Sequence, residues 1–177
     1  MELLEAIEKR YSYRGKFTDR KVSRDELKMI VEAGLKAPSG KNCQTTRFVI
    51  IDDEDIKDKI QAMENASPAI KSASAYIACI VNKEPEKVYE GCSFEVEDCA
   101  AAVENMLLVI TSLGLESVWV DGWLRLNERA HNIGKLINLP ESMVIRVILP
   151  IGKAEKEGHG PKKMSFEQRA AFNSYDL

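Results

Sequence analysis

The sequence is poor in the residues that build metal and disulfide centres. Its 177 residues include two histidines and four cysteines, and no two cysteines are spaced as Cys-x-x-Cys. Because a structural zinc site takes four such ligands, no zinc-ligand cluster can be drawn from this set. We therefore expect no metal, and we expect reduced thiols with structural roles at Cys43, Cys79, Cys92 and Cys99.

Long apolar runs are also absent. The longest stretches without a charged residue, 72–82 and 105–115, have 11 residues each, whereas a membrane-spanning helix needs about 20 apolar residues. The first eight residues mix acidic and apolar side chains, and they lack the basic segment and the continuous apolar stretch of a secretory signal. These features predict a cytoplasmic protein with no membrane partner.

An excess of positive charge is lacking as well. Lys and Arg total 25 against 28 for Asp and Glu, a net charge of −3, and so we expect no nucleic-acid partner. With 45% hydrophobic and 30% charged residues, the composition is typical of a globular protein, and the length suits one domain. We predict a single domain over residues 1–177, in which the extension 152–177 has too few apolar residues for a core of its own and packs on another surface.

The pattern of apolar residues predicts strands that alternate with helices. Strands are indicated at 47–52, 76–81, 115–120 and 144–151, and the β-branched run at 47–52 is expected to be a buried strand. Helices are indicated at 2–9, 23–35, 94–113 and 127–137, with another beginning at 53. Ser23 and Glu26 have the spacing of a capping box, and Gly114 supplies a helix stop. The second half of the 94–113 helix is apolar on all sides, and we expect it at the centre of the core.

Arg10, Ser12 and Arg14 form the first candidate site. In an extended chain alternate residues point to one side, so two guanidinium groups and a hydroxyl would converge there. Guanidinium groups match phosphate oxygens in geometry and in charge. A phosphate site is therefore one interpretation, and a solvated basic strand is the other.

Two further segments could contact a ligand. Residues 37–44 end a helix and bring a hydroxyl, two carboxamides and backbone N–H groups to the start of a strand, where they could read a polar heterocycle. An ordinary turn is the alternative. Residues 114–122 read as a core strand that ends in Asp121 and Gly122, whose main chain could face a ligand. The alternative there is that Trp119 is simply a core residue.

Taken together and in this order, the segments resemble the FMN-dependent nitroreductase-like family. The resemblance covers most of the chain, from near the N-terminus to Lys163. Its matching stretches are Arg10–Arg14 followed by Phe17, then Ala37–Gln44, Arg47–Ile50, Glu104–Leu108, Gly114–Trp119, Leu139–Pro140, Leu149–Gly152 and Pro161–Lys163.

The resemblance implies an α+β fold in which helices sandwich a mixed, mainly antiparallel sheet. It also implies an intertwined homodimer with two FMN molecules at the subunit interface, and a 152–177 extension that packs on the partner subunit. It assigns the phosphate and ribityl chain of the flavin to Arg10, Tyr11, Ser12 and Arg14, with Lys162 or Lys163 to complete the phosphate site. It assigns further flavin contacts to a loop of the neighbouring subunit, at Pro38, Ser39, Gly40, Asn42 and Gln44. The redox-active edge of the ring is assigned to Asp121 and Gly122.

The implied activity is that of an FMN-dependent oxidoreductase. NADH or NADPH would reduce the flavin, and a nitroaromatic, a quinone or a similar small acceptor would then oxidise it in a ping-pong cycle, with no catalytic side chain required. Two alternatives stay open. One is a flavoenzyme of the same fold with a specialised reaction, such as reductive dehalogenation or oxidative flavin chemistry. The other is a non-enzymatic, flavin-binding redox sensor with Cys43 as the residue of interest.

The sequence departs from the family pattern at three places. Thr45 and Thr46 stand where relatives commonly have Pro-Trp, so we expect a smaller or more polar pocket wall. Tyr11 stands where a second arginine is often found, which predicts one phosphate contact fewer. The connector 82–91 is short, and this favours an acceptor pocket that is open or built mostly by the partner chain.

Overall fold

A four-stranded antiparallel sheet forms the centre of the molecule. The computed structural model describes residues 1–175. The strands lie in the order β1-β2-β4-β3, and each neighbouring pair is antiparallel. Their bounds are Arg47–Ile51 for β1, Ala75–Asn82 for β2, Glu116–Ser117 for β3 and Met143–Gly152 for β4. The expected α+β class and mainly antiparallel sheet are confirmed.

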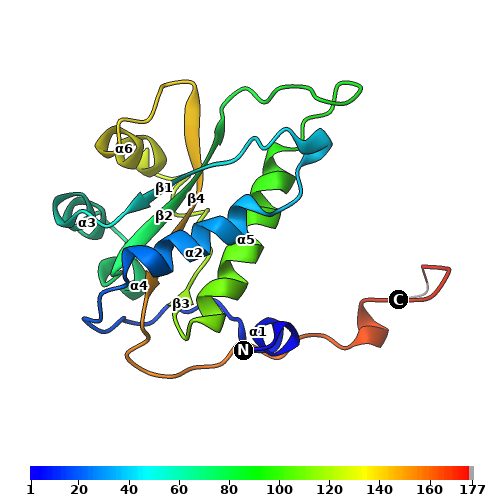
Figure 1. The fold of residues 1–177 in the computed structure, drawn as a ribbon, viewed down its shortest axis with the longest axis horizontal. Helices are drawn as coiled ribbons and strands as arrows, with labels where there is room; N and C mark the ends of the chain where they lie inside the picture. Colours follow the sequence, from blue (N-terminus) through cyan, green and yellow to red (C-terminus); the bar gives the residue numbers. More distant parts are fainter. Residues whose placement is uncertain (176–177) are drawn as a thin grey trace.

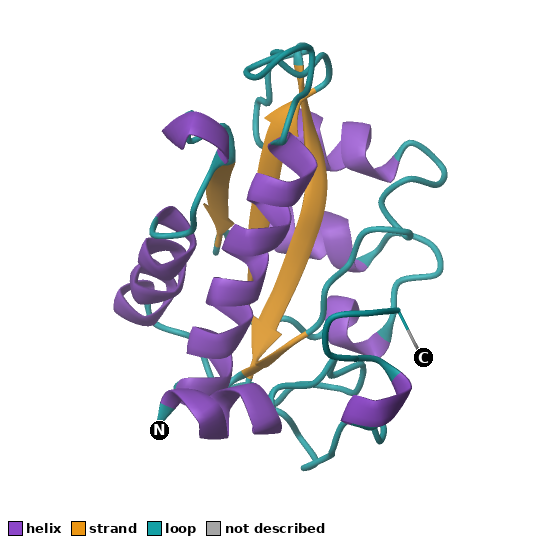
Figure 2. Cartoon of the chain, turned by 90° about the vertical axis from the view of Figure 1, so that its right-hand side faces the viewer, coloured by secondary structure: helices purple, strands orange, loops and turns teal. Residues whose placement is uncertain are grey.

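Helices cover both faces of this sheet, as Figures 1 and 2 show. On one face lie α2 (Arg24–Leu35) and α5 (Glu95–Ser112). On the other lie α3 (Glu54–Gln61), α4 (Pro68–Lys71) and α6 (Arg129–Leu136). The remaining elements are α1 (Leu3–Lys9) and two short 3-10 turns, η1 (Gly40–Asn42) and η2 (Phe166–Gln168). Within residues 1–175 we find no helix with the length and hydrophobicity that crossing a membrane requires.

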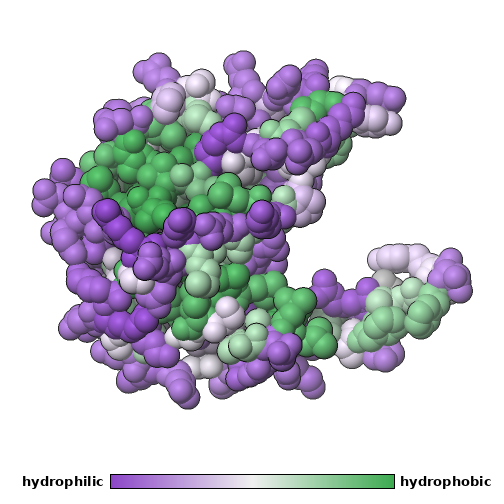
Figure 3. Space-filling view, viewed as in Figure 1, coloured by the Kyte–Doolittle hydropathy of each residue, from purple (hydrophilic) through white to green (hydrophobic). Residues whose placement is uncertain are grey.

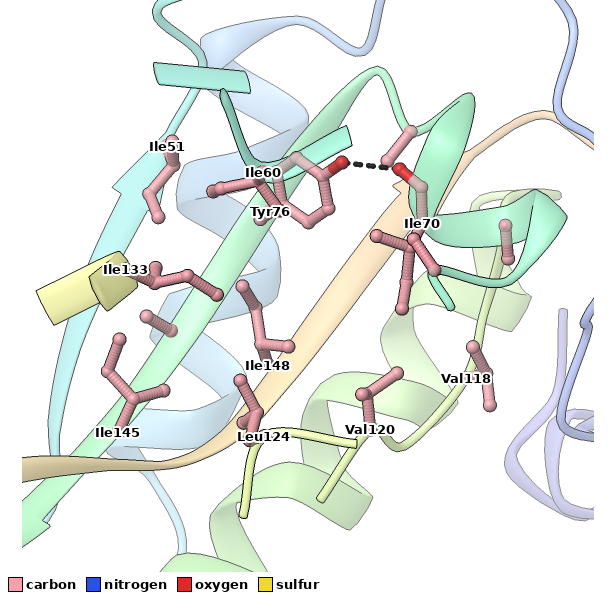
Figure 4. Close-up of a cluster of buried hydrophobic side chains, with 14 of the residues drawn as sticks. Ile51, Ile60, Ile70, Tyr76, Val118, Val120, Leu124, Ile133, Ile145 and Ile148 are labelled. Carbon is pink, nitrogen blue, oxygen red and sulfur yellow. Dashed lines mark hydrogen bonds between the residues drawn. The ribbon is translucent and has the colours of Figure 1, made fainter. Parts of the chain in front are cut away.

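The two central strands are buried on both faces, which explains their continuous apolar sequences. In β2, Tyr76 and Ile80 join the cluster beneath α3, α4 and α6, whereas Ile77 and Cys79 join the cluster beneath α2 and α5. Figure 4 shows the first cluster, in which the Tyr76 hydroxyl donates a hydrogen bond to the Ile70 carbonyl. Burial raises the pKa of this phenol. The hydroxyl therefore stays protonated and fixes α4 to the sheet.

Several predicted element ends are confirmed by their capping contacts. Ser23 accepts a hydrogen bond from the Glu26 N–H, and Glu26 accepts one from Ser23 in return, so the capping box is present. Asp53 caps α3 through the Ile56 N–H. Gly114 follows α5 with a φ of 66°, the left-handed conformation that glycine adopts at helix ends. The free thiols expected at the four cysteines are also present.

Three local expectations are wrong or incomplete. The 47–52 strand is not fully buried, because β1 lies at the sheet edge with Ile50 exposed. The 115–120 strand shortens to β3 and a single bridge between Val120 and Ile148. The last helix begins at Arg129 and not at Asn127, because Asn127 and Glu128 have φ values of 53° and 54°, which a helix excludes.

The C-terminal segment leaves the body beside α1 (Figure 1). Gly158 and Gly160 pass closely over Tyr11, where a Cβ atom on either glycine would lie 2.9 to 3.0 Å from the tyrosine side chain. Beyond Gly160 the described residues are almost all exposed, and the rings of Phe166 and Phe172 pack together with centroids 5.6 Å apart. Figure 3 shows an open hollow between this segment and the body.

Candidate functional site

The segment from Arg10 to Arg14 runs in extended form from the end of α1 to the sheet. The Tyr13 N–H donates to the Ser117 carbonyl at 2.9 Å, and the buried Tyr13 ring packs on Phe17. Since successive residues of an extended chain face opposite sides, this contact leaves the neighbours of Tyr13 on the outer side. The Arg14 guanidinium donates to the Ser12 carbonyl at 3.3 Å.

Arg10 is held by a partner on α5. Its Nε lies 3.4 Å from Glu104 Oε1, and the arginine side chain is mostly buried, whereas the glutamate side chain is half exposed. Arg10 and Arg14 therefore have different surroundings. Arg10 is anchored by an acid, whereas Arg14 has a neighbouring carbonyl and lines an open cavity.

That cavity has a volume of about 220 Å³ and brings two predicted segments together. Arg14, Asp121 and Gly122 all line it. Other lining residues, among them Asn65, Ser67, Trp119 and Trp123, were not assigned to the site from the sequence. A weak signal existed for the first two, because Ser67 followed by Pro68 is a typical start of a helix.

Asp121 contributes its main chain, not its carboxylate, to this cavity. Both carboxylate oxygens are bound by Arg125, at 2.6 and 2.9 Å, and Arg146 donates to one of them at 2.7 Å. These three hydrogen bonds occupy the carboxylate and hold it against Arg125 and Arg146. The next residue, Gly122, is exposed, and a Cβ placed on it would meet nothing within 4 Å. The main chain at Gly122 is therefore accessible to a ligand.

The loop around this corner is fixed by a buried arginine. Arg129, only 4% exposed, donates to the Trp123 carbonyl at 2.9 Å and to the Glu64 carbonyl at 3.1 Å. Its guanidinium also lies 4.9 Å from the centroid of the Trp123 ring. Trp119, in contrast, is 36% exposed and lines the cavity. The interpretation of Trp119 as a plain core residue is therefore wrong.

The loop from Pro38 to Gln44 lies at a second cavity, of about 330 Å³, between α2 and α5. Pro38, Ser39 and Gln44 line it together with Thr45 and Thr46. The wall at the two threonines carries hydroxyl groups, and the Thr46 hydroxyl is buried without a hydrogen-bond partner among the described residues. Asn42 is exposed beside this cavity.

The predicted site residues therefore fall into separate groups within one chain. The cavity at Arg14 and Gly122 shares no lining residue with the cavity at the Pro38 loop. Lys162 and Lys163 lie on the exposed C-terminal segment. One chain alone does not bring these groups to a common point, and their joint role stays a prediction.

Glu116, in β3, is an acidic residue with an unusually high pKa. Burial raises the pKa of its carboxyl to about 7, and the charge of Lys153 opposes the shift. The pKa of Tyr11 is raised as well, first by burial and then by the charge of Glu116. The C-terminal segment leaves the body over Tyr11.

We expect the Glu116→Gln variant to change how stability depends on pH. Because the folded state binds the Glu116 proton more tightly than the unfolded state, the free energy of unfolding falls as pH rises from about 4.5 to 7. Urea denaturation should show the variant more stable than the wild type at pH 8, by about 1 kcal/mol once solvent screening of this half-exposed group is included. The difference should vanish at pH 4. A matched change at the exposed Glu157, to Gln, should give no such pH dependence.

Comparison with known proteins decides the family. The model of the nitroreductase family matches residues 7–89 and 74–153, which is most of the chain. The chain belongs to the nitroreductase family. A relative from Methanothermobacter thermautotrophicus, provisionally named as an NADH dehydrogenase/NAD(P)H nitroreductase, is 31% identical over 159 residues, 89% of this chain and 81% of the relative. The resemblance found in the sequence and the oxidoreductase class are thereby confirmed.

Solved structures of nitroreductase relatives agree with the fold. A protein of Bacteroides thetaiotaomicron, also provisionally named as an NADH dehydrogenase/NAD(P)H nitroreductase, superposes with a TM-score of 0.83 at 25% identity and covers 98% of both chains. A nitroreductase of Desulfovibrio desulfuricans, solved in complex with FMN, gives a TM-score of 0.77 at 27% identity over 95% of both chains.

Proposed function

We propose that this chain is an FMN-dependent oxidoreductase that takes electrons from NADH or NADPH and passes them to a small acceptor such as a nitroaromatic or a quinone. The observation that carries the proposal is the cavity that Arg14 lines together with Gly122, whose main chain is open to a ligand. The FMN complex of the Desulfovibrio relative supports the choice of cofactor.

The residues present fit a flavin mononucleotide. Its phosphate needs cations, and Arg14 and Arg10 lie on the segment that we assign to it, with Lys162 or Lys163 to be added from the C-terminal segment. Its ring needs hydrogen-bond donors without steric obstruction, and Gly122 has open space where any other residue would carry a side chain. Trp119 and Trp123 provide an apolar wall.

We further propose that the complete site forms between two chains. The loop from Pro38 to Gln44 lies at a different cavity from Arg14, so a second copy would supply it. Two exposed apolar surfaces support a homodimer. One is α1, with Leu3, Leu4 and Ile7, and the other is the C-terminal segment, with Phe166 and Phe172 among its residues. The extension would pack on the partner subunit.

FMN, when bound, supplies the hydride and electron transfer of a ping-pong cycle. The chain's own residues bind and orient. Main-chain N–H groups at Asp121 and Gly122 would stabilise negative charge on the reduced ring, and guanidinium groups would hold the phosphate. The Asp121 carboxylate is bound by Arg125 and Arg146 and orients this main chain, and protons would come from solvent.

A flavin titration tests the proposal. The purified protein should be yellow or should quench the fluorescence of added FMN, and NADH or NADPH under anaerobic conditions should bleach its absorbance near 450 nm, roughly the usual flavin band. A quinone should then restore the colour. Protein that binds no FMN would overturn the assignment, whereas bound flavin that neither nicotinamide reduces would favour the redox-sensor alternative.

A further inference from the structure

Asp98 is a buried carboxylate that the proposed chemistry leaves without a role. It lies in the first turn of α5 and is only 7% exposed. Its Oδ1 accepts a hydrogen bond from the Gly40 N–H at 2.9 Å, and its Oδ2 accepts one from the Thr45 hydroxyl at 3.1 Å. One side chain therefore holds both ends of the segment 40–45.

The segment between these two contacts has an unfavourable backbone conformation. Lys41, Asn42 and Gln44 have φ values of 48°, 56° and 49°, in the left-handed region that L-residues rarely adopt. Such a conformation persists only where surrounding contacts hold it. Within the loop, Ser39 Oγ accepts from the Gln44 N–H at 3.0 Å. Asp98 adds the only two contacts to α5 that we find in the described hydrogen bonds of this loop.

Phe94 closes the loop from a second side. A Cβ on Gly40 would lie 2.6 Å from the Phe94 ring, so the glycine backbone sits directly against this side chain. The close approach brings the Gly40 N–H within reach of Asp98, which follows Phe94 by one turn of α5. Phe94 and Asp98, at the start of α5, therefore fix the position of the loop.

We infer that Asp98 is a positioning residue for the flavin, which it serves by holding the 40–45 segment in the conformation that presents Asn42 and Gln44 to the ring. The inference rests on the proposed function. It also gives Thr45 a role, because the threonine supplies the hydroxyl that Asp98 binds, which the proline common at this place in the family would lack.

Four variants test this inference. Asp98→Ala removes both contacts, and Thr45→Val removes one of them with little change in shape. Asp98→Asn keeps an acceptor for the Gly40 N–H and a donor for the Thr45 oxygen, so it should restore function. Glu97→Ala, at the exposed neighbouring acid of α5, is the matched control. The measurements are the Kd for FMN, the midpoint potential of the bound flavin and the melting temperature of the flavin-free protein.

We expect Asp98→Ala to raise the Kd for FMN by about 10- to 100-fold and to shift the midpoint potential. Thr45→Val should raise the Kd by about 2- to 10-fold, and the other two variants should match the wild type. Unchanged Kd and potential in Asp98→Ala, with only a lower melting temperature, would overturn the inference. If Asp98→Ala does not fold, an unchanged Kd and potential in Thr45→Val would overturn it. Wild-type protein that binds no FMN would instead refute the proposed function.

Discussion

A chain that ends after Gly160 should lose high-affinity FMN binding while it keeps its fold. The residues beyond this point include Lys162 and Lys163 and the exposed aromatic pair Phe166 and Phe172. They are almost all exposed, whereas Gly160, which the shorter chain keeps, passes closely over Tyr11. We therefore expect the melting temperature of the truncated chain to stay close to that of the flavin-free wild type. The Kd for FMN should rise by more than about 100-fold, because the truncation removes the lysine proposed to complete the phosphate site, Lys162 or Lys163, and also the segment proposed to hold the two subunits together.

The same truncation should also convert the dimer to a monomer, since the extension is proposed to pack on the partner subunit. Analytical ultracentrifugation measures this directly. A Lys162→Ala/Lys163→Ala double variant separates charge from packing, because it should weaken FMN binding and leave the dimer intact. Lys156→Ala, at an exposed lysine of the same segment, should change neither property. A truncated chain that still dimerises and binds FMN with wild-type affinity would refute the role of the extension.

The second large effect is expected from Arg14→Ala. This arginine lines the cavity that also contains Gly122. Among residues 1–175 the Ser12 carbonyl is the one hydrogen-bond partner that we find for its guanidinium, so its charge is available to a phosphate. A charge-assisted contact contributes about 1.5 to 3 kcal/mol, which corresponds to a Kd about 10- to 150-fold higher. Fluorescence titration with FMN measures the change.

Arg24→Ala is a suitable control for Arg14→Ala. Arg24 carries the same charge, its side chain is 85% exposed and pairs with Asp52, and it does not line the cavity at Gly122. Its loss should leave the Kd for FMN unchanged. If Arg14→Ala also bound FMN as tightly as the wild type, the assignment of the FMN phosphate to Arg14 would be refuted.

The sequence predicted the central elements of the fold well, for physical reasons that lie within each segment. The apolar runs of β2 and β4 require burial on both faces, and the capping box at Ser23 and Glu26 requires a helix start. The edge position of β1 could not be predicted, because Phe48 to Ile51 are as apolar as a central strand. Ile50 is exposed because β1 lies at the edge of the sheet, and the order in which the strands pair depends on the whole chain.

The candidate site was predictable as a set of residues but not as a geometry. Arg14, Asp121 and Gly122 were expected near a ligand, and the structure brings them to one cavity. The contribution of Asp98 was hidden, because a buried acid of a helix and a loop 58 residues away have no local signal in common. Arg146 did interrupt an apolar strand, and the reason is now visible in its bond to Asp121.

A complementation experiment tests the central claim, that each flavin site is built from two chains. One chain would carry Arg14→Ala, and the other would carry Asn42→Gly and Gln44→Gly, which remove both amide side chains at positions whose positive φ glycine tolerates. Different affinity tags would isolate the mixed dimer. If each site takes Arg14 from one chain and the loop with Asn42 and Gln44 from the other, one site of the mixed dimer carries both defects. The second site then carries none.

The mixed dimer should therefore bind one FMN with wild-type affinity and be reduced by NADH or NADPH at that site, although each parent dimer binds FMN weakly. If every contact came from one chain, both sites of the mixed dimer would carry a defect, and no wild-type affinity would appear. That second result would contradict the two-chain site.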